Sequence, residues 1–117
     1  HSTSSAASDV YKRQAYASSK GALLNMTKSL ARALGPIRVN AICPGFIQGD
    51  WLRNGLGDEV YEMVKEATEK STPLKLTVTA DQVADSIIYF VEDAVTTTGE
   101  TLLLDGGMHL GGPVPLK

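Results

Sequence analysis

The chain has 117 residues, 43% hydrophobic and 21% charged, a composition typical of one folded domain or part of a larger one. Its 11 basic and 13 acidic side chains give a net charge of −2 without a basic cluster, which argues against a nucleic-acid partner. No apolar run is long enough to cross a membrane, and the single Cys43 excludes an internal disulfide and favours a cytoplasmic protein.

The start of the chain, residues 1–14, is interpreted as truncated. It begins without methionine and lacks the charged and apolar regions of a signal peptide. Within it, DVYKRQ at 9–14 matches a translated transposon-end adapter from sequencing libraries, and we interpret it as an adapter scar without fold information. An ordinary polar loop before a helix is the alternative. Under both interpretations, residues 9–14 are left out of the mechanism.

A long amphipathic helix is predicted from Ala15 to Leu34. At about 100° per residue, one arc of this helix carries both apolar and polar positions, namely Tyr16, Lys20, Leu23, Thr27, Leu30 and Leu34. We expect this arc to face the core, and we expect a left-handed Gly35 followed by Pro36 to end the helix. Because lysine is rarely buried without a partner, Lys20 on this arc needs an explanation beyond packing.

A short strand is predicted at 37–43, with the sequence IRVNAIC, and it ends at Pro44 and Gly45. A strand that follows a helix so closely indicates an α/β unit. Ligands of open α/β sheets bind at the carboxyl ends of the strands. The turn at Pro44 and Gly45 is therefore a candidate binding position.

Residues 46–73 are expected to begin as a loop or short helical turns and to continue as a helix. An apolar repeat with helical spacing predicts this helix and consists of Val60, Met63, Val64 and Ala67. On the same helix, Glu66 and Lys70 are one turn apart and are expected to pair. We interpret residues 46–73 as a substrate loop or lid. A helix packed permanently on the domain is the equal alternative.

The last third of the chain repeats the order of helix and strand. Thr79 and Gln82 form a capping-box signature that opens a helix running to about Asp93. Its predicted buried stripe is Val83, Ala84, Ile87, Ile88 and Val91. The stretch GETLLLDGG at 99–107 predicts a second strand. Two parallel strands alone make a poor sheet, so residues 15–117 are interpreted as the carboxyl-terminal part of one domain with further strands.

The Tyr16 and Lys20 pair has a structural and a chemical interpretation. In the structural one, Lys20 extends its stem to solvent and Tyr16 caps the core, and a bare Tyr-x-x-x-Lys is too weak a motif to exclude this. In the chemical one, an ammonium beside a phenol favours the phenolate and lowers its pKa from about 10. A phenol tuned in this way serves as a general acid or base.

Three stretches in this order resemble the carboxyl-terminal part of the short-chain dehydrogenase/reductase family: YASSK, RVNAICPGFI and TGETLLLDGG. The resemblance covers residues 16 to about 110. It implies an α/β fold, the carboxyl-terminal part of a Rossmann-like doubly wound parallel sheet, truncated before the glycine-rich loop, which is absent from the sequence. It also implies an NAD(P)-dependent oxidoreductase that interconverts a secondary alcohol and a ketone by hydride transfer, with NAD and NADP not distinguished. We expect the chain by itself to be inactive.

The resemblance assigns roles to five residues. Tyr16 would be the catalytic acid/base, and Lys20 would bind the ribose next to the nicotinamide and support the ionised tyrosine. Pro44 and Gly45 would close the strand beside the cofactor. The backbone of Ile47 would meet the carboxamide of the nicotinamide.

The chain departs from the family pattern at two positions. The serine that polarises the substrate carbonyl aligns with Thr3, whereas the local wording SSAAS favours Ser5 as the catalytic serine. Gly49 stands where the family has a threonine near the cofactor. Cys43 and His109 are assigned no chemistry, and no metal site is expected.

The resemblance also implies partners. The substrate would be a small-molecule alcohol or ketone, and the parent protein a homodimer or homotetramer. A noncatalytic oligomerisation or binding module derived from the same fold is the alternative, because the long helix and the last helix and strand resemble the surfaces by which this family assembles.

Overall fold

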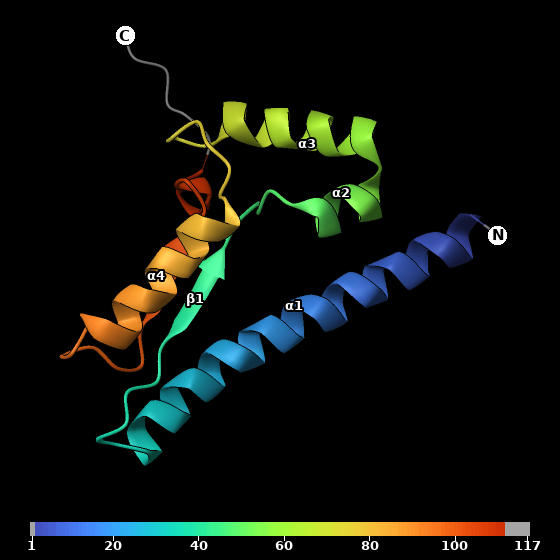
Figure 1. Cartoon of the computed structure of the whole chain (residues 1–117). Helices are drawn as coiled ribbons and strands as arrows, with labels where there is room; N and C mark the ends of the chain where they lie inside the picture. Colours follow the sequence, from blue (N-terminus) through green and yellow to red (C-terminus); the bar gives the residue numbers. More distant parts are fainter. Residues whose placement is uncertain (1, 112–117) are drawn as a thin grey trace, which may run out of the picture. The chain divides into compact units, whose positions relative to one another are not determined.

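The computed structural model describes residues 2–111, with side chains from residue 14 onward (Figure 1). The chain divides into two compact units, one reaching Ala41 and including Thr97–Glu100, the other formed by Ile42–Thr96 and the residues from Thr101. The elements in chain order are α1 (Ser2–Ala33), β1 (Ala41–Pro44), α2 (Asp50–Leu56), α3 (Asp58–Ser71), α4 (Ala80–Glu92), β2 (Thr101–Leu104) and a 3-10 helix η1 (Met108–Leu110).

The first unit is dominated by α1, which begins well before the predicted Ala15. Residues 9–14 lie inside this helix, so the interpretation of this stretch as a polar loop is wrong. Residues 2–14 contain neither glycine nor proline, and nothing in their sequence interrupts a helix. The helix ends at Ala33, and the predicted left-handed Gly35 is also wrong, since Gly35 does not have a positive φ.

The arc of α1 predicted to face the core is mostly exposed. Thr27 is buried and donates its hydroxyl to the Leu23 carbonyl at 2.8 Å. Ala31 is also buried, and a Cβ built on Gly99 would lie 3.5 Å from its side chain. The exposed members of the arc are Tyr16, Lys20, Leu23, Leu30 and Leu34. The described residues therefore cover this helix only around Thr27 and Ala31.

Asn40 explains why β1 is shorter than the predicted strand. Its side chain donates to the Thr97 carbonyl and accepts from the Glu100 amide, both at 3.0 Å. The main chains are already joined before this point, by the Gly99 amide and the Val39 carbonyl at 2.7 Å, and the next bond runs from the Ala41 amide to the Glu100 carbonyl at 2.9 Å. The regular strand begins only at Ala41, so the predicted strand at 37–43 is wrong in its first four residues.

β1 and β2 pair in parallel, as predicted for an α/β unit. The amides of Ala41 and Gly45 donate to the carbonyls of Glu100 and Leu104, so both strands run in the same direction. A further parallel bridge joins Ile47 to Val78, just beyond the end of β1.

The helix predicted within 46–73 is α3, and its expected ion pair between Glu66 and Lys70 is confirmed at 2.9 Å. The capping box of α4 is confirmed as well. The Thr79 amide donates to Gln82 Oε1 at 2.9 Å, and the Gln82 amide donates to Thr79 Oγ1 at 3.2 Å. α4 ends at Glu92, one residue before the predicted Asp93.

The inward face of α3 differs from the predicted one. Val60, Met63 and Val64, which form the apolar repeat, are exposed, Met63 by 63%. Tyr61 is instead 3% exposed, and Lys65 on the same face is half-buried. The apolar repeat therefore identified the helix but not its covered side.

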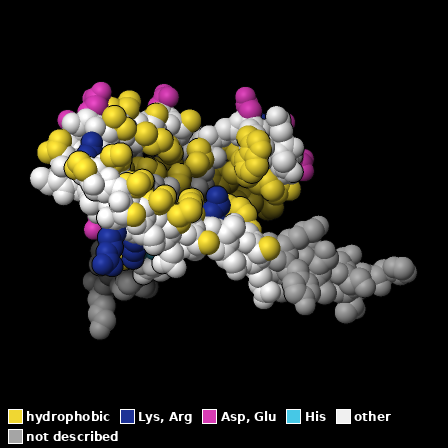
Figure 2. All heavy atoms as spheres, turned by 90° about the horizontal axis from the view of Figure 1, so that it is seen from below, with side chains coloured by type: hydrophobic (Ala, Val, Ile, Leu, Met, Phe, Trp, Pro, Cys, Tyr) yellow, Lys and Arg dark blue, Asp and Glu magenta, His cyan; other side chains and the backbone are white. Residues whose placement is uncertain are grey.

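The predicted buried stripe of α4 is wrong for the described part of the chain, where no residue of this helix is buried. Ile87, Ile88 and Val91 are exposed, Val91 by 66%. Figure 2 shows hydrophobic side chains, in yellow, gathered over much of the surface seen from below.

Among the described helices, none has the length and apolar character needed to span a bilayer.

Candidate functional site

Tyr16 and Lys20 lie one turn apart on α1, where the helical backbone places residues of this spacing on the same face. The Lys20 Nζ atom is 5.3 Å from the centroid of the Tyr16 ring, close enough for a cation–π contact. Tyr16 is 66% exposed, so it does not cap a core in the described structure. The structure thus brings together a phenol and an ammonium that a ligand can reach.

The third predicted catalytic residue, Ser5, lies on the part of α1 whose side chains fall outside the described residues, as does Thr3. The catalytic role of Ser5 therefore stays a prediction.

Gly45 follows β1 at a point of close backbone approach. Its amide donates to the Leu104 carbonyl at 2.9 Å, which holds it against the end of β2. A Cβ built on Gly45 would lie 3.0 Å from both Cα and Cβ of Asp105. Only glycine fits here without a backbone shift, because a side chain would meet another part of the main chain.

Gly45→Ala is expected to destabilise the protein by about 1–3 kcal/mol, the usual cost of forcing extra volume into a packed site. Urea unfolding followed by circular dichroism measures the change. Gly55→Ala in α2 is the matched control, because its new Cβ meets no atom within 4 Å. Equal stability of the two variants would contradict the close contact with Asp105.

The backbone N–H and C=O of Ile47 are left open by the parallel bridge that this residue forms with Val78. Val78 donates its amide to the Phe46 carbonyl at 2.9 Å and accepts from the Gln48 amide at 2.8 Å. In a parallel bridge, the residue between two such bonds directs its own N–H and C=O to the opposite side. Neither group of Ile47 bonds to another described residue. The N–H donor and the C=O acceptor of Ile47 are thus both available to a ligand.

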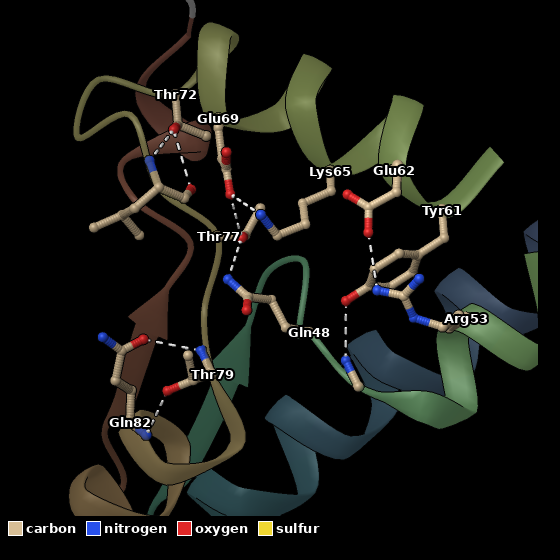
Figure 3. Close-up of polar contacts among 12 residues, drawn as sticks. Gln48, Arg53, Tyr61, Glu62, Lys65, Glu69, Thr72, Thr77, Thr79 and Gln82 are labelled. Carbon is tan, nitrogen blue, oxygen red and sulfur yellow. Dashed lines mark hydrogen bonds and ion pairs between the residues drawn. The ribbon is translucent and has the colours of Figure 1, made fainter. Parts of the chain in front are cut away.

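Tyr61 of α3 holds the segment around Ile47 from one end (Figure 3). Its hydroxyl accepts from the Gly49 amide at 3.2 Å, and its ring lies 5.5 Å from that of Phe46. The Arg53 guanidinium lies 4.3 Å from the Tyr61 ring centroid and 2.9 Å from Glu62. A hydrogen bond to Glu62 is the main cause that raises the pKa of Arg53, so the cation persists.

A chain of polar side chains reaches the same segment from further along α3 (Figure 3). Gln48 Nε2 donates to Thr77 Oγ1 at 2.8 Å, and the Thr77 hydroxyl donates to Glu69 Oε1 at 2.9 Å. Lys65 Nζ lies 2.8 Å from the same Glu69 oxygen. The hydrogen bond from Lys65, followed by that from Thr77, lowers the pKa of Glu69.

These contacts on α3 were not predicted, because the predictions for this helix rested on its apolar spacing and on the Glu66–Lys70 pair. Tyr61, Lys65 and Glu69 are each four residues apart, and that spacing was the available signal for a shared face. The partners Gln48 and Thr77 are distant in sequence and carry no local signal.

Asp105 organises the turn after β2. Its carboxylate accepts from the amides of Gly107 and His109 at 3.0 Å, and His109 Nδ1 also lies 3.0 Å from it. Burial raises the pKa of Asp105, but the hydrogen bonds from His109 and Gly107 outweigh it and hold the pKa below its usual range. No chemistry was predicted for His109, and the structure pairs it with Asp105.

Asp105 is expected to make stability fall in acid. Because its pKa is lower in the folded chain than in the unfolded one, the ionised carboxylate stabilises the fold above about pH 3.9. This contribution is lost as the pH falls through the lowered pKa. Thermal unfolding between about pH 5 and about pH 2 should show a steeper loss for the parent than for Asp105→Asn. Identical slopes would contradict the assigned role.

The comparisons with known proteins agree on one family. Residues 1–109 match the family described as Enoyl-(Acyl carrier protein) reductase. Over 97 residues the chain is 38% identical to the 2-(R)-hydroxypropyl-CoM dehydrogenase of Xanthobacter autotrophicus, covering 80% of this chain and 38% of that protein. It is 34% identical over 96 residues to the 3-oxoacyl-(acyl-carrier-protein) reductase of Rickettsia felis, again covering 80% of this chain and 38% of the relative.

A solved structure of a dehydrogenase is also similar to this chain. A small-chain dehydrogenase in complex with NADPH superimposes with a TM-score of 0.72 at 30% identity, covering 78% of this chain and 41% of that one. The chain therefore spans well under half the length of the proteins it matches.

Proposed function

The chain belongs to the short-chain dehydrogenase/reductase family, and on this basis we propose that the whole protein is an NAD(P)-dependent oxidoreductase that interconverts a secondary alcohol and a ketone. Its fold is part of a Rossmann-like α/β domain with a parallel sheet. The observation that carries the proposal is the exposed pair of Tyr16 and Lys20, with Nζ 5.3 Å from the ring centroid.

The residues present fit a nicotinamide cofactor. The carboxamide of nicotinamide offers one acceptor and one donor group, and Ile47 has a backbone N–H and C=O free among the described residues to match them. Lys20 carries an exposed ammonium that donates to ribose hydroxyls. The cofactor, NAD or NADP, supplies the hydride chemistry. The NADPH held by the similar dehydrogenase supports a cofactor of this class.

The protein residues would move the proton and hold the reactants. During ketone reduction, the Tyr16 hydroxyl donates its proton to the carbonyl oxygen, and it takes the proton back in the reverse direction. Lys20 would donate from its ammonium to the ribose hydroxyls beside the reacting ring. Ser5 would donate a hydrogen bond to the substrate carbonyl. Pro44 and Gly45 would keep the following backbone in place, because the Gly45 amide donates to the Leu104 carbonyl at the end of β2.

The substrate class is supported by the relatives' names. One refers to a 2-hydroxypropyl group, which is a secondary alcohol, and the other to a 3-oxoacyl group, which is a ketone. We propose that residues 46–73 form the substrate loop, where the exposed side chains of Trp51 and Met63 offer apolar contact. A small alcohol or ketone with an apolar portion suits such a surface.

A noncatalytic module that assembles with copies of itself is the second candidate. The exposed apolar residues of α4, among them Ile87, Ile88 and Val91, favour association with another surface. A homodimer or homotetramer is proposed for both candidates, so assembly alone does not separate them.

The function is tested by titrating the whole protein with NADH and NADPH, and by following nicotinamide absorbance with a panel of ketones. We expect binding of at least one cofactor and its oxidation by a ketone. Absence of binding to either cofactor, with the protein folded and oligomeric, would replace the enzyme by the noncatalytic module.

A further inference from the structure

The covered face of α3 is polar where it meets the segment that follows β1. This face carries Lys65 and Glu69, which reach Gln48 through the hydroxyl of Thr77. Thr77 is only 5% exposed, whereas the aliphatic residues of α3 at Val60 and Val64 are exposed. A buried polar contact in place of an apolar one restricts geometry more tightly, because hydrogen bonds have narrow distance and angle requirements.

We propose that the side-chain series Lys65, Glu69, Thr77 and Gln48 is a positioning device that sets the backbone of Ile47 for contact with the nicotinamide carboxamide. The inference rests on the proposed function, since it concerns the same cofactor. None of the four side chains needs to touch the cofactor. They act through Ile47, so they are positioning residues.

The direction of the hydrogen bonds makes the series specific. An ionised carboxylate only accepts, so Glu69 draws the single hydroxyl hydrogen of Thr77 toward itself. The Thr77 oxygen is then left to accept from Gln48 Nε2. Lys65 keeps Glu69 charged and limits its rotation through a contact at 2.8 Å. The side chain of Gln48 is therefore held in one orientation.

The backbone bonds transmit this restraint to Ile47. Gln48 is fixed twice, through its side chain to Thr77 and through its amide to the Val78 carbonyl at 2.8 Å. On the other side of Ile47, the Phe46 carbonyl accepts from the Val78 amide at 2.9 Å. Since Thr77 and Val78 are adjacent, one short stretch of chain determines where the free N–H and C=O of Ile47 point.

Thr77→Val in the whole protein tests the proposal, because it keeps the shape of the side chain and removes the hydroxyl. Loss of a partly buried hydrogen bond of ordinary strength predicts an increase of about 3- to 10-fold in the dissociation constant of the preferred nicotinamide cofactor. ADP-ribose, or its 2′-phosphate if NADP is preferred, lacks the nicotinamide and should bind with unchanged affinity. Thr77→Ser retains a hydroxyl and should restore the parent's affinity within about twofold.

A second variant distinguishes a loss of positioning from a folding defect. Gln48→Met removes the amide from a residue less buried than Thr77 and leaves Thr77 bonded to Glu69. It should weaken nicotinamide binding in the same direction while the thermal midpoint stays near that of the parent.

The outcomes separate the two proposals. A parent protein that binds no nicotinamide cofactor refutes the proposed function. A parent that binds it, with Thr77→Val and Gln48→Met of equal affinity, refutes the positioning role alone. Equal weakening of ADP-ribose and of the complete cofactor also refutes this role, because it would reflect a general disturbance of the fold.

Discussion

Tyr16→Phe is expected to lower turnover of the whole protein by about 10²–10⁴-fold, the contribution typical of a general acid or base. The variant keeps the aromatic ring, and with it the contact of Lys20 Nζ at 5.3 Å from the ring centroid. Only the hydroxyl that would exchange a proton with the substrate oxygen is lost. Nicotinamide affinity should therefore stay near the parent's, while steady-state turnover falls.

Tyr89→Phe provides the matched control for this experiment. Tyr89 is also an exposed tyrosine on a helix, but it belongs to α4 and has no proposed role. Its variant should retain parental turnover. Parental turnover in Tyr16→Phe would end the assignment of Tyr16 as the acid/base, whatever its effect on stability.

Lys20→Met is expected to reduce both nicotinamide affinity and turnover. The variant keeps much of the side-chain stem but removes an ammonium that would donate to ribose hydroxyls. Hydrogen bonds to a charged group contribute about 1.5–3 kcal/mol, which corresponds to a loss of about 10- to 150-fold in affinity. Titration calorimetry with the preferred cofactor measures this loss, and turnover at saturating cofactor measures the separate effect on the chemical step.

Lys28→Met is the matched control, because Lys28 is an exposed lysine on the same α1 helix and has no proposed ligand. Lys28→Met should bind the cofactor as the parent does. If Lys20→Met and Lys28→Met have the same affinity, Lys20 only extends into solvent. Lys20→Met should therefore change both affinity and turnover, whereas Tyr16→Phe should change turnover alone.

The local signals of the sequence predicted most of the elements. The capping box of Thr79 and Gln82, the ion pair of Glu66 and Lys70 and the order of helix and strand all appear in the structure. Each depends on residues within one turn or on a short run of β-branched and aliphatic side chains. Such local signals predict the same element whatever tertiary contacts surround it.

The side of a helix that is covered could not be predicted in the same way. In α3 the apolar residues Met63 and Val64 are exposed. Tyr61 instead contacts Gly49 after β1, and Glu69 accepts from Thr77 before α4. Apolar spacing indicates which face would gain most from burial, but burial also requires a neighbouring surface. Around α4 the described residues do not provide one.

For this protein, the sequence alone determined the helical pairing of Tyr16 with Lys20, the α/β order of the elements and the family resemblance. The pairing depends on near neighbours, and the other two on the order of short stretches along the chain. The tertiary structure decided the rest. It placed Gly45 against Asp105 and linked Gln48 to Glu69 through Thr77. The first contact depends on the parallel pairing that brings the ends of β1 and β2 together, and the second on the parallel bridge between Ile47 and Val78, so neither can be predicted from local sequence.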